Sequence, residues 1–425
     1  METGGPVKLK PRRRAAGAAT DDGPSPATAP QELGSLDSQQ LFAQAERGDD
    51  AYLWPDEPVR MSEDMVDPLI LWCVGLGASD ITIQSDRPAY AEISGRLYAC
   101  TKRPLDGADM AVFLNRIYGA EASAKLASGV DLDLSYEIRP DRYSRVRFRT
   151  NITAMLSKGR DAASVTMRVL PNTPPQMADL GIEREIIDAW KPRQGLVLVT
   201  GPTGSGKTTL LAAGNRMLIE AEEGCGKLLS YEAPIEYVYD SIAGPRSLVS
   251  QAEIPRHLPN FAAGVRNALR RKPEIILVGE ARDRETVSAA IEAGQTGHTV
   301  YSTVHTLGVA PTLRRMMSVF EPAERNERAF ALMETLRLIV TQVLVPRIGG
   351  GRIGLREWMA FDDELREQLL STSPDEWSAA VMKAVPERGR TMAESARLAY
   401  EAGKIDRRRY LVLSQSAKSG AMPDL

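Results

Sequence analysis

The stretch that decides the fold is Gly195-Leu-Val-Leu-Val-Thr-Gly-Pro-Thr-Gly-Ser-Gly-Lys-Thr-Thr209. An apolar strand runs into a glycine-rich loop, and a helix is predicted to begin at Lys207. The spacing is that of a P-loop, G-x4-G-K-T from Gly201 to Thr208. Its glycines let several backbone N–H groups face one point, where the start of the helix adds a positive dipole. A plain glycine turn is the alternative, but the complete pattern predicts a nucleotide site.

The loop and the first turn of the helix supply the predicted phosphate contacts. Lys207 is expected to reach the β and γ phosphates, and the Thr208 hydroxyl is expected to bind Mg²⁺. Binding is predicted more firmly than hydrolysis, which the loop alone does not prove. The predicted nucleotide-binding residues here are Gly201, Pro202, Thr203, Gly204, Ser205, Gly206, Lys207, Thr208 and Thr209.

Composition excludes several classes of protein. The chain has 425 residues, of which 43% are hydrophobic and 26% charged, so it is neither wholly disordered nor fibrous. Its 53 Lys and Arg against 56 Asp and Glu argue against a dedicated duplex-DNA coat. Cys73, Cys100 and Cys225 are odd in number and widely spaced. They predict neither a disulfide framework nor a zinc site, and a reducing compartment fits best.

No membrane span is predicted from the apolar runs. The longest, 68–77 and 338–346, fall short of the ~18 residues that cross a bilayer. A basic cluster at 8–14 is followed by small and polar residues, so we do not expect a signal peptide. That cluster is either a solvated tail or an electrostatic contact with a membrane or partner.

The chain divides by composition into a tail, two domains, a stiff linker and an extension. The N-terminal part is rich in small and polar residues and is predicted to be disordered, apart from a short helix near Leu36–Arg47. Pro171-Asn-Thr-Pro-Pro175 suits neither a helix nor a central strand. The predicted parts are a disordered tail at 1–58, a small α+β domain at 59–171, the linker at 172–182, a P-loop ATPase domain at 183–370 and a helical extension at 371–425.

Alternating apolar strands and helices follow the linker. Continuous apolar strands of this kind predict an α/β fold with a parallel sheet covered on both faces. In the extension, Thr391 and Glu394 predict a capping box and Gly403 a helix stop. The predicted strands are 196–200, 228–231, 275–278 and 299–304, and the predicted helices begin at 207, 261 and 284.

Two glutamates come directly after predicted strands. In Ile275-Ile-Leu-Val-Gly-Glu280 an apolar strand ends in an acid, which is the Walker B arrangement for reaching Mg²⁺ or the attacking water. A capping acid after an ordinary buried strand is the alternative for Glu280. Glu232 ends the strand before it, with Pro234 stopping the pairing. We expect Glu232 to orient or deprotonate water, with a plain surface acid as the alternative.

Histidines flank one predicted strand, at His298 and His305. Either is suited to bond or sense a γ-phosphate, and the structural alternative stays open for both. Arginines crowd the end of the small domain, with Arg145, Arg147 and Arg149 alternating on one strand face. They are predicted arginine fingers for a nucleotide in the same or a neighbouring subunit. The alternative is a solvated basic face paired with Asp131, Asp133 or Glu137.

Together these motifs resemble the secretion ATPases of the type II/type IV superfamily, from about residue 61 to about residue 411. The P-loop is followed in the family's order by 232–236, 278–283 and 296–306. The chain is most similar to the pilus-retraction (PilT-like) branch and its DotB/TraJ-like group from type IVB (Dot/Icm and conjugative) systems. The run 250–262 is typical of that group. Ala233 is one departure, because the family usually has Asp there.

The resemblance implies a RecA-like P-loop domain preceded by a small PAS-like α+β domain. It further implies a homohexameric ring with ATP and Mg²⁺ between the two domains of each subunit. Under it Glu232 is the catalytic acid, Glu280 the Walker B acid and a Mg²⁺ ligand together with Thr208. His298 is implied to bind nucleotide. The other implied catalytic residues are Lys207, His305, Arg149 and Arg168, with Arg160 a weaker match.

We therefore predict a Mg²⁺-dependent ATPase that powers a type IVB secretion, conjugative-transfer or related pilus-like machine by motion between its domains. The expected partners are copies of itself and inner-membrane secretion proteins, without sequence-specific nucleic-acid binding. The expected location is the cytoplasmic face of the bacterial inner membrane, as a peripheral protein. Two other classes stay open: a nucleic-acid motor, disfavoured by 6% aromatic residues, and a scaffold that binds ATP without turning it over.

Overall fold

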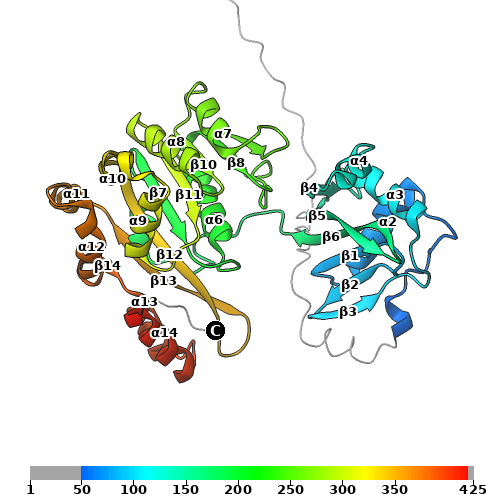
Figure 1. Cartoon of the computed structure of the whole chain (residues 1–425). Helices are drawn as coiled ribbons and strands as arrows, with labels where there is room; N and C mark the ends of the chain where they lie inside the picture. The colour runs from blue at the N-terminus through cyan, green and yellow to red at the C-terminus, as the bar shows by residue number, and fades with distance from the viewer. Residues whose placement is uncertain (1–48, 420–425) are drawn as a thin grey trace, which may run out of the picture. The chain divides into compact units, whose positions relative to one another are not determined.

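The computed structural model describes residues 49–419, with side chains for residues 50–414. The predicted helix near Leu36–Arg47 lies outside this range. The described part holds two β-sheets, one of six strands and one of eight. Figure 1 draws the first sheet from blue through cyan to blue-green and the second from green to orange.

The six-stranded sheet belongs to the small α+β domain and has the order β3-β2-β1-β6-β5-β4. All neighbouring strands run antiparallel, and alternate residues of β1 are buried. The sequence pattern predicts helices near 65–76 and 108–118 and strands at 81–83, 90–93, 145–149 and 164–169, and all of them are confirmed. Strands β3 and β4 and helix α4 were not predicted. The strands are β1 (Asp80–Gln84), β2 (Tyr90–Ile93), β3 (Arg96–Ala99), β4 (Leu132–Ile138), β5 (Val146–Ser157) and β6 (Arg160–Leu170).

Apolar side chains from the helices of this domain pack on its sheet. Leu69 and Phe113 share a core with Ile81 and Phe148, and all four are fully buried. Burial of such side chains stabilises the domain by roughly 1.5–3 kcal/mol each. The helices are the 3-10 turn η1 (Asp49–Tyr52), α2 (Glu63–Gly75), α3 (Gly107–Ile117) and α4 (Ala122–Ala127).

The eight-stranded sheet has the order β14-β13-β12-β7-β11-β10-β8-β9. From β12 to β9 the neighbours are parallel, as predicted, whereas β13 and β14 pair antiparallel at one side of the sheet. The strands are β7 (Gly195–Thr200), β8 (Gly226–Glu232), β9 (Ser247–Glu253), β10 (Ile275–Val278), β11 (Thr299–Val304), β12 (Leu336–Pro346), β13 (Arg352–Ala360) and β14 (Gly389–Arg390).

Helices cover both faces of this sheet, as the continuous apolar strands predict. In β7, Leu196 and Leu198 enter one core and Val197 and Val199 the other. The first core is closed by α7 to α12 and the second by α5 and α6. The helices are α5 (Arg184–Ala189), α6 (Lys207–Glu220), α7 (Phe261–Ala268), α8 (Arg284–Gln295), α9 (Val309–Ser318), α10 (Pro322–Thr335), α11 (Asp363–Leu370) and α12 (Pro374–Arg388).

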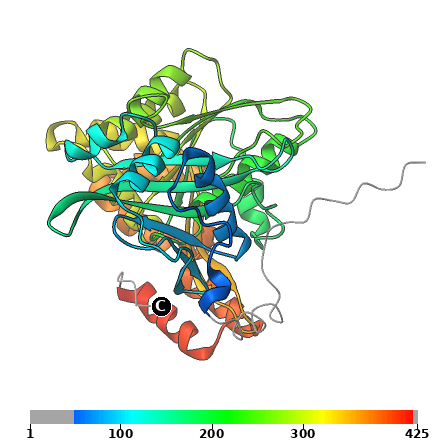
Figure 2. The same ribbon diagram turned by 90° about the vertical axis from the view of Figure 1, so that its right-hand side faces the viewer.

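The C-terminal helices extend this domain. Trp377 of α12 is fully buried in the core that holds Leu198, so α12 is an integral layer of the sheet domain. Helices α13 (Met392–Glu401) and α14 (Arg407–Ser419) lie side by side in Figure 1 and in the turned view of Figure 2. The Thr391 hydroxyl accepts from the Glu394 N–H at the start of α13. The boundary at residue 371 is therefore best drawn after α12, which we propose as a revision.

Two further expectations concern membranes and cysteines. Within residues 49–419, no helix combines the length and the apolar character that a membrane span requires. Cys73, Cys100 and Cys225 are free thiols and all three are buried.

Candidate nucleotide site

The predicted site residues gather where parallel strands end. Parallel strands share one carboxyl edge, and the chain leaves four neighbouring strands there in the order β7, β11, β10 and β8. Thr200 lies opposite Val304, and Val278 lies beside both Ser302 and Tyr231. Strands β7, β11 and β10 lead directly into the P-loop, His305 and the Gly279–Glu280 pair, and β8 ends at Glu232. The topology therefore brings the loop, one histidine and both acids to one edge.

The P-loop has the backbone that its glycines predict. Gly201, Gly204 and Gly206 have φ values of +142°, +76° and +79°, a region that other residues rarely adopt. Gly206 is also the residue before the first turn of α6. The Lys207 ammonium donates to the carbonyls of Gly201 and Pro202 at 3.0 and 2.9 Å. The Lys207 side chain therefore folds back onto the P-loop.

Lys207 is 8% exposed, and burial lowers the pKa of its ammonium. Glu280 and Glu236 act in the opposite direction and favour the charged form. A buried ammonium whose charge is only partly compensated by nearby carboxylates is stabilised when an anion binds beside it. The electrostatics of Lys207 therefore suit a phosphate.

Two hydroxyls of the loop fit a nucleotide and its metal. The Ser205 hydroxyl is buried, and no hydrogen-bond partner for it exists among the described residues. A buried polar atom left this way is costly, and a phosphate oxygen would satisfy it. The Thr208 hydroxyl and the Glu280 carboxylate offer oxygen ligands, the type that Mg²⁺ prefers. The residues present therefore fit ATP with Mg²⁺.

Glu232 is the last residue of β8 and is 6% exposed. Its Oε1 accepts from the Ser230 hydroxyl at 2.7 Å and from the Gln251 amide at 3.2 Å. Burial raises the pKa of this carboxyl to about 7, and the two hydrogen bonds counteract the rise only partly. A carboxylate poised near neutral pH is suited to accept a proton from water. The plain surface acid that was the alternative for Glu232 is wrong.

Glu280 and His305 face each other across the ends of β10 and β11. His305 Nε2 lies 3.8 Å from Glu280 Oε1, and both side chains are partly exposed. Burial lowers the pKa of His305, Lys207 lowers it further, and Glu280 raises it. The imidazole is therefore neutral at pH 7 and able to donate one hydrogen bond and accept another.

His298 lies away from this group. It precedes β11 instead of following it, so the length of the strand separates it from His305. Its Nδ1 lies 3.2 Å from the Ala293 carbonyl oxygen, and its own carbonyl accepts from the Gly195 N–H at 2.9 Å. Within one chain, the expectation that His298 contacts nucleotide does not hold, because the amino edge of a parallel sheet lies opposite the P-loop.

The small-domain arginines are not equivalent. Arg149 and Arg168 are direct cross-strand neighbours on β5 and β6. Arg168 is 69% exposed and pairs with Asp80 at 2.8 Å, while Arg149 Nη1 lies 3.9 Å from Glu236. Arg160 begins β6, at its far end from Arg168. Both Arg149 and Arg168 therefore keep guanidinium surface available to an anion.

Arg147 has a different role from its neighbours on β5. Its side chain is almost fully buried, and it donates to the Ile235 and Glu236 carbonyls at 2.5 and 2.8 Å. Glu137, one of the acids in the alternative, lies 3.9 Å from Arg147. Arg147 thus bonds the small domain to the segment after Glu232, which a solvated basic face does not do.

Sequence reasoning missed several residues that lie beside the loop or beside Glu232. Gln342 of β12 donates to the Ser205 carbonyl at 2.7 Å, and Arg356 of β13 holds Gln342 in turn. Glu253 of β9 accepts from the backbone N–H groups of Ser135 and Ile235. One signal was available: Thr341-Gln342 interrupts the apolar run 338–346, and a polar side chain inside a buried strand needs a partner.

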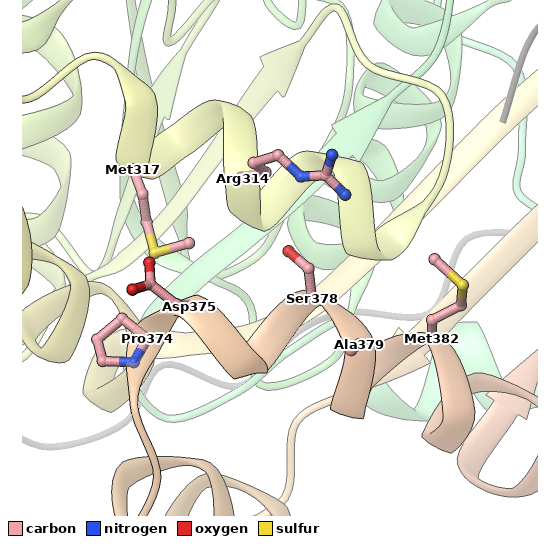
Figure 3. Close-up of a pocket in the computed structure, with 7 residues that line it drawn as sticks. All are labelled: Arg314, Met317, Pro374, Asp375, Ser378, Ala379 and Met382. Carbon is pink, nitrogen blue, oxygen red and sulfur yellow. The ribbon is translucent and has the colours of Figure 1, made fainter.

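A separate hollow of about 360 Å³ lies between α9 and α12 (Figure 3). Among the described residues that line it, the charged side chains are Arg314 from α9 and Asp375 from α12. One guanidinium beside a carboxylate gives a triphosphate little net attraction, and none of the predicted site residues lines the hollow. We assign no ligand to it.

The chain matches a known family and known structures. The family described as type II/IV secretion system protein matches residues 134–350. The chain is 33% identical over 301 residues to the type IV pilus retraction ATPase PilT of Pseudomonas aeruginosa, covering 71% of this chain and 84% of PilT. The X-ray structure of the Legionella pneumophila ATPase DotB has a TM-score of 0.82 and 47% identity, covering 86% of this chain and 99% of that one.

A second solved structure extends this match to a bound nucleotide. The pilus retraction motor PilT with bound ADP has a TM-score of 0.72 and 29% identity, covering 83% of this chain and 98% of that one. The eight-stranded sheet with its P-loop is accordingly the RecA-like domain of these ATPases. The chain belongs to the type II/IV secretion system ATPases, a family of ATP-hydrolysing enzymes, and within it is PilT-like and similar to DotB.

Proposed function

We propose that this chain hydrolyses ATP with Mg²⁺ as a homohexameric ring and powers a type IVB secretion, conjugative-transfer or related pilus-like machine. The observation that carries the proposal is the meeting of the P-loop, the buried Glu232 and the Glu280–His305 pair at one sheet edge. The similarity to DotB and to the ADP-bound PilT motor supports the choice of nucleotide and machine.

The loop and Lys207 bind and orient the triphosphate. Backbone N–H groups between Gly201 and Thr208 donate to phosphate oxygens, and the start of α6 adds its positive dipole. Lys207 exchanges the two loop carbonyls for phosphate oxygens when nucleotide enters. Fixed donors of this kind stabilise the charge that develops during phosphoryl transfer without reorganising.

Thr208 and Glu280 would hold Mg²⁺ through their oxygen atoms, Glu280 directly or through water. Mg²⁺ held there would neutralise part of the phosphate charge. His305 Nε2 lies 3.8 Å from Glu280 Oε1, which is longer than a hydrogen bond, so a small approach of the two side chains would let the imidazole orient the Glu280 carboxylate. His305 is therefore a positioning residue for Glu280 in the first place.

Glu232 prepares the attacking water in this proposal. Its pKa of about 7 lets the ionised carboxylate take a proton from water near neutral pH, while the Ser230 and Gln251 bonds fix its orientation. Ala233 removes the second acid that the family usually has at the next position. With one acid fewer at this position, we assign the proton to Glu232 itself.

Arg149 and Arg168 of the small domain bind the negatively charged phosphates in this proposal. The nucleotide is bound either by the same chain or by the next subunit in the ring. Arg147 already ties β5 to the carbonyls after Glu232, so a change around Glu232 is passed to the small domain. This bond supports coupling between hydrolysis and motion of the two domains. The partners are then other copies of the chain and proteins of a membrane-bound secretion complex, with the chain at the cytoplasmic face of the inner membrane.

The test measures oligomer mass and phosphate release on the same preparation. With ATP and Mg²⁺ we expect a particle of six chains and steady phosphate release, and removing Mg²⁺ with a chelator should stop the release. Glu280→Gln should keep the six-chain mass and lose most of the turnover. Turnover equal to the parent in both Glu280→Gln and Lys207→Ala would contradict the proposal, as would a chain that stays monomeric with ATP.

A further inference from the structure

We propose that Gln342 is a positioning residue that sets the shape of the P-loop, and that Arg356 and Glu183 hold it in place. The inference rests on the proposed role of the loop in binding phosphate. It concerns residues on β12, β13 and the segment before α5, none of which belongs to the P-loop motif.

The Gln342 side chain controls one peptide plane of the loop. Its Nε2 donates to the Ser205 carbonyl oxygen at 2.7 Å, with Ser205 and Gln342 only 2% and 4% exposed. The Ser205–Gly206 peptide is trans and planar, so its C=O and N–H point in opposite directions. Because the C=O is held toward β12, the Gly206 N–H is turned away from β12, to the side where phosphate would lie.

The orientation of the Gln342 amide is itself fixed. Its Oε1 accepts from Arg356 Nε at 2.8 Å, which leaves only the NH₂ group to face Ser205. Arg356 is almost fully buried and also donates to the Leu180 carbonyl and to Glu183 Oε2 at 3.2 and 3.1 Å. A guanidinium with several directional donors holds such a geometry where a lysine would not.

Glu183 supplies the charge that keeps Arg356 in the interior. Its second oxygen accepts from Arg390 of β14 at 3.2 Å, so one carboxylate joins two arginines. Breaking a buried pair by removing one partner leaves an uncompensated charge. The network therefore runs from Arg390 through Glu183 and Arg356 to Gln342 and ends on the Ser205 carbonyl.

The loop glycines also lie directly on Gln342. A Cβ at Gly206 would come within 2.9 Å of Gln342 Nε2, and a Cβ at Gly201 would come within 2.2 Å of the Gln342 carbonyl oxygen. Contacts this close leave the loop no room to move toward β12. Packing against Gln342 thus limits movement of the loop toward β12. The hydrogen bond from Gln342 fixes the orientation of the Ser205–Gly206 peptide.

The test titrates ADP with Mg²⁺ into the parent chain and into Gln342→Met, which keeps the length of the side chain and loses both polar atoms. Without Gln342, the Gly206 N–H is no longer held toward the phosphate. Because a hydrogen bond to a charged group contributes substantially to binding, the affinity for ADP should weaken at least about tenfold. In steady state the KM for ATP should rise while kcat changes much less, because the Gly206 N–H contacts phosphate before and during the reaction.

The matched control is Thr335→Val, at the last residue of α10 directly before β12. Thr335 is 2% exposed, and its hydroxyl donates to the Ala331 and Leu332 carbonyls, so the variant also loses a buried bond to backbone. It should lower the melting temperature to a similar degree and leave ADP affinity within twofold of the parent. ADP affinity within twofold in a folded Gln342→Met would overturn the inference.

A second variant decides the matter if Gln342→Met does not fold. Gln342→Glu keeps an acceptor for Arg356, gains a charge pair with it, and places an oxygen against the Ser205 carbonyl. It should fold and still bind ADP at least about tenfold more weakly. The loss should persist in high salt, which screens long-range repulsion and leaves a buried contact unchanged. Unchanged affinity in Gln342→Glu would refute the role, whereas absence of ADP binding by the parent would contradict the proposed function itself.

Discussion

The carboxyl edge and the amino edge of the parallel strands in the RecA-like sheet differ in how deeply they bury polar side chains. At the carboxyl edge Lys207 and Glu232 are buried, and the buried Ser205 hydroxyl lacks a partner among the described residues. At the amino edge the His298 ring and the Lys227 ammonium both lie within hydrogen-bond distance of backbone carbonyls. The carboxyl edge therefore buries two ionisable groups and one unpaired hydroxyl, whereas the polar groups at the amino edge are only partly buried and bond backbone carbonyls.

The difference separates a binding edge from a structural one. Buried groups of this kind destabilise a fold unless something else compensates them, so a protein that keeps several together is prepared for a ligand. The same strands and the same helices form both edges. What differs is the type of residue at each end of the strands, and paired substitutions at the two edges test this difference.

The largest effect is expected at Glu232. Glu232→Gln keeps the size and both hydrogen-bond partners and loses the proton acceptor, so kcat should fall by roughly 10²–10⁴-fold with ADP affinity little changed. The control is Glu274→Gln, an exposed acid just before β10 at the amino edge, which should leave kcat unchanged. A kcat for Glu232→Gln within threefold of the parent would show that another group takes the proton.

The pH dependence of turnover tests the same residue without a substitution. Glu232 must be ionised to accept a proton, and its pKa is about 7, so kcat should fall tenfold for each pH unit below that value and about a hundredfold by pH 5. The sign follows from burial, which raises the pKa of this carboxyl above its ordinary value. A pH–kcat profile that is flat between pH 5 and 8 in the folded protein would be inconsistent with this role.

Replacing one lysine at each edge by alanine compares how much the two edges contribute to ADP binding. Lys207→Ala should weaken ADP binding roughly tenfold to a hundredfold, because a charged donor to phosphate is lost. Lys227→Ala removes an ammonium that donates to the Arg271 carbonyl at the amino edge and should leave ADP affinity unchanged. Calorimetric titration of both variants decides the point, and equal losses would erase the distinction between the edges.

The two histidines flank one strand and should differ. His305→Ala removes the imidazole that lies 3.8 Å from the Glu280 carboxylate and is proposed to orient it, so kcat should fall by up to about tenfold. His298→Ala should stay within twofold, since that ring bonds the Ala293 carbonyl on the opposite edge. Steady-state phosphate release on the two variants makes the comparison. A larger loss for His298→Ala would mean that this histidine acts across a subunit contact.

The smallest effect is expected at Glu183, at the remote end of the network under the loop. Glu183→Gln leaves Arg356 without its carboxylate, and ADP affinity should fall about threefold through the altered Gln342. Arg397→Ala serves as the control, because its partners Glu394 and Glu401 lie on α13. If both variants bind ADP equally well, Glu183 does not support the loop.

Much of the fold was predictable because its signals are local. The P-loop, the strand ends at Glu232 and Val278 and the helices after them follow from short runs of residues, and all are confirmed. The antiparallel β13 and the edge strand β9 were not predicted. Their residues alternate in burial or are half exposed, so they lack the continuous apolar run that identifies a central strand.

The site was predictable only in part, because sequence order does not show which end of a strand a residue occupies in space. His298 and His305 look alike in sequence, yet the strand between them puts them at opposite edges. Gln342 and Arg356 reach the loop from strands more than a hundred residues away, and their contacts depend on the order β13-β12-β7. Such contacts appear only when the sheet is assembled.

The most direct measurement is amide hydrogen exchange of the intact protein with and without ADP and Mg²⁺. If the phosphates are bound at the carboxyl edge, exchange should slow in peptides that cover 201–209 and stay the same in peptides that cover 294–299 at the amino edge. Unchanged exchange at 201–209 with ADP in saturating excess, or protection confined to 294–299, would contradict the account.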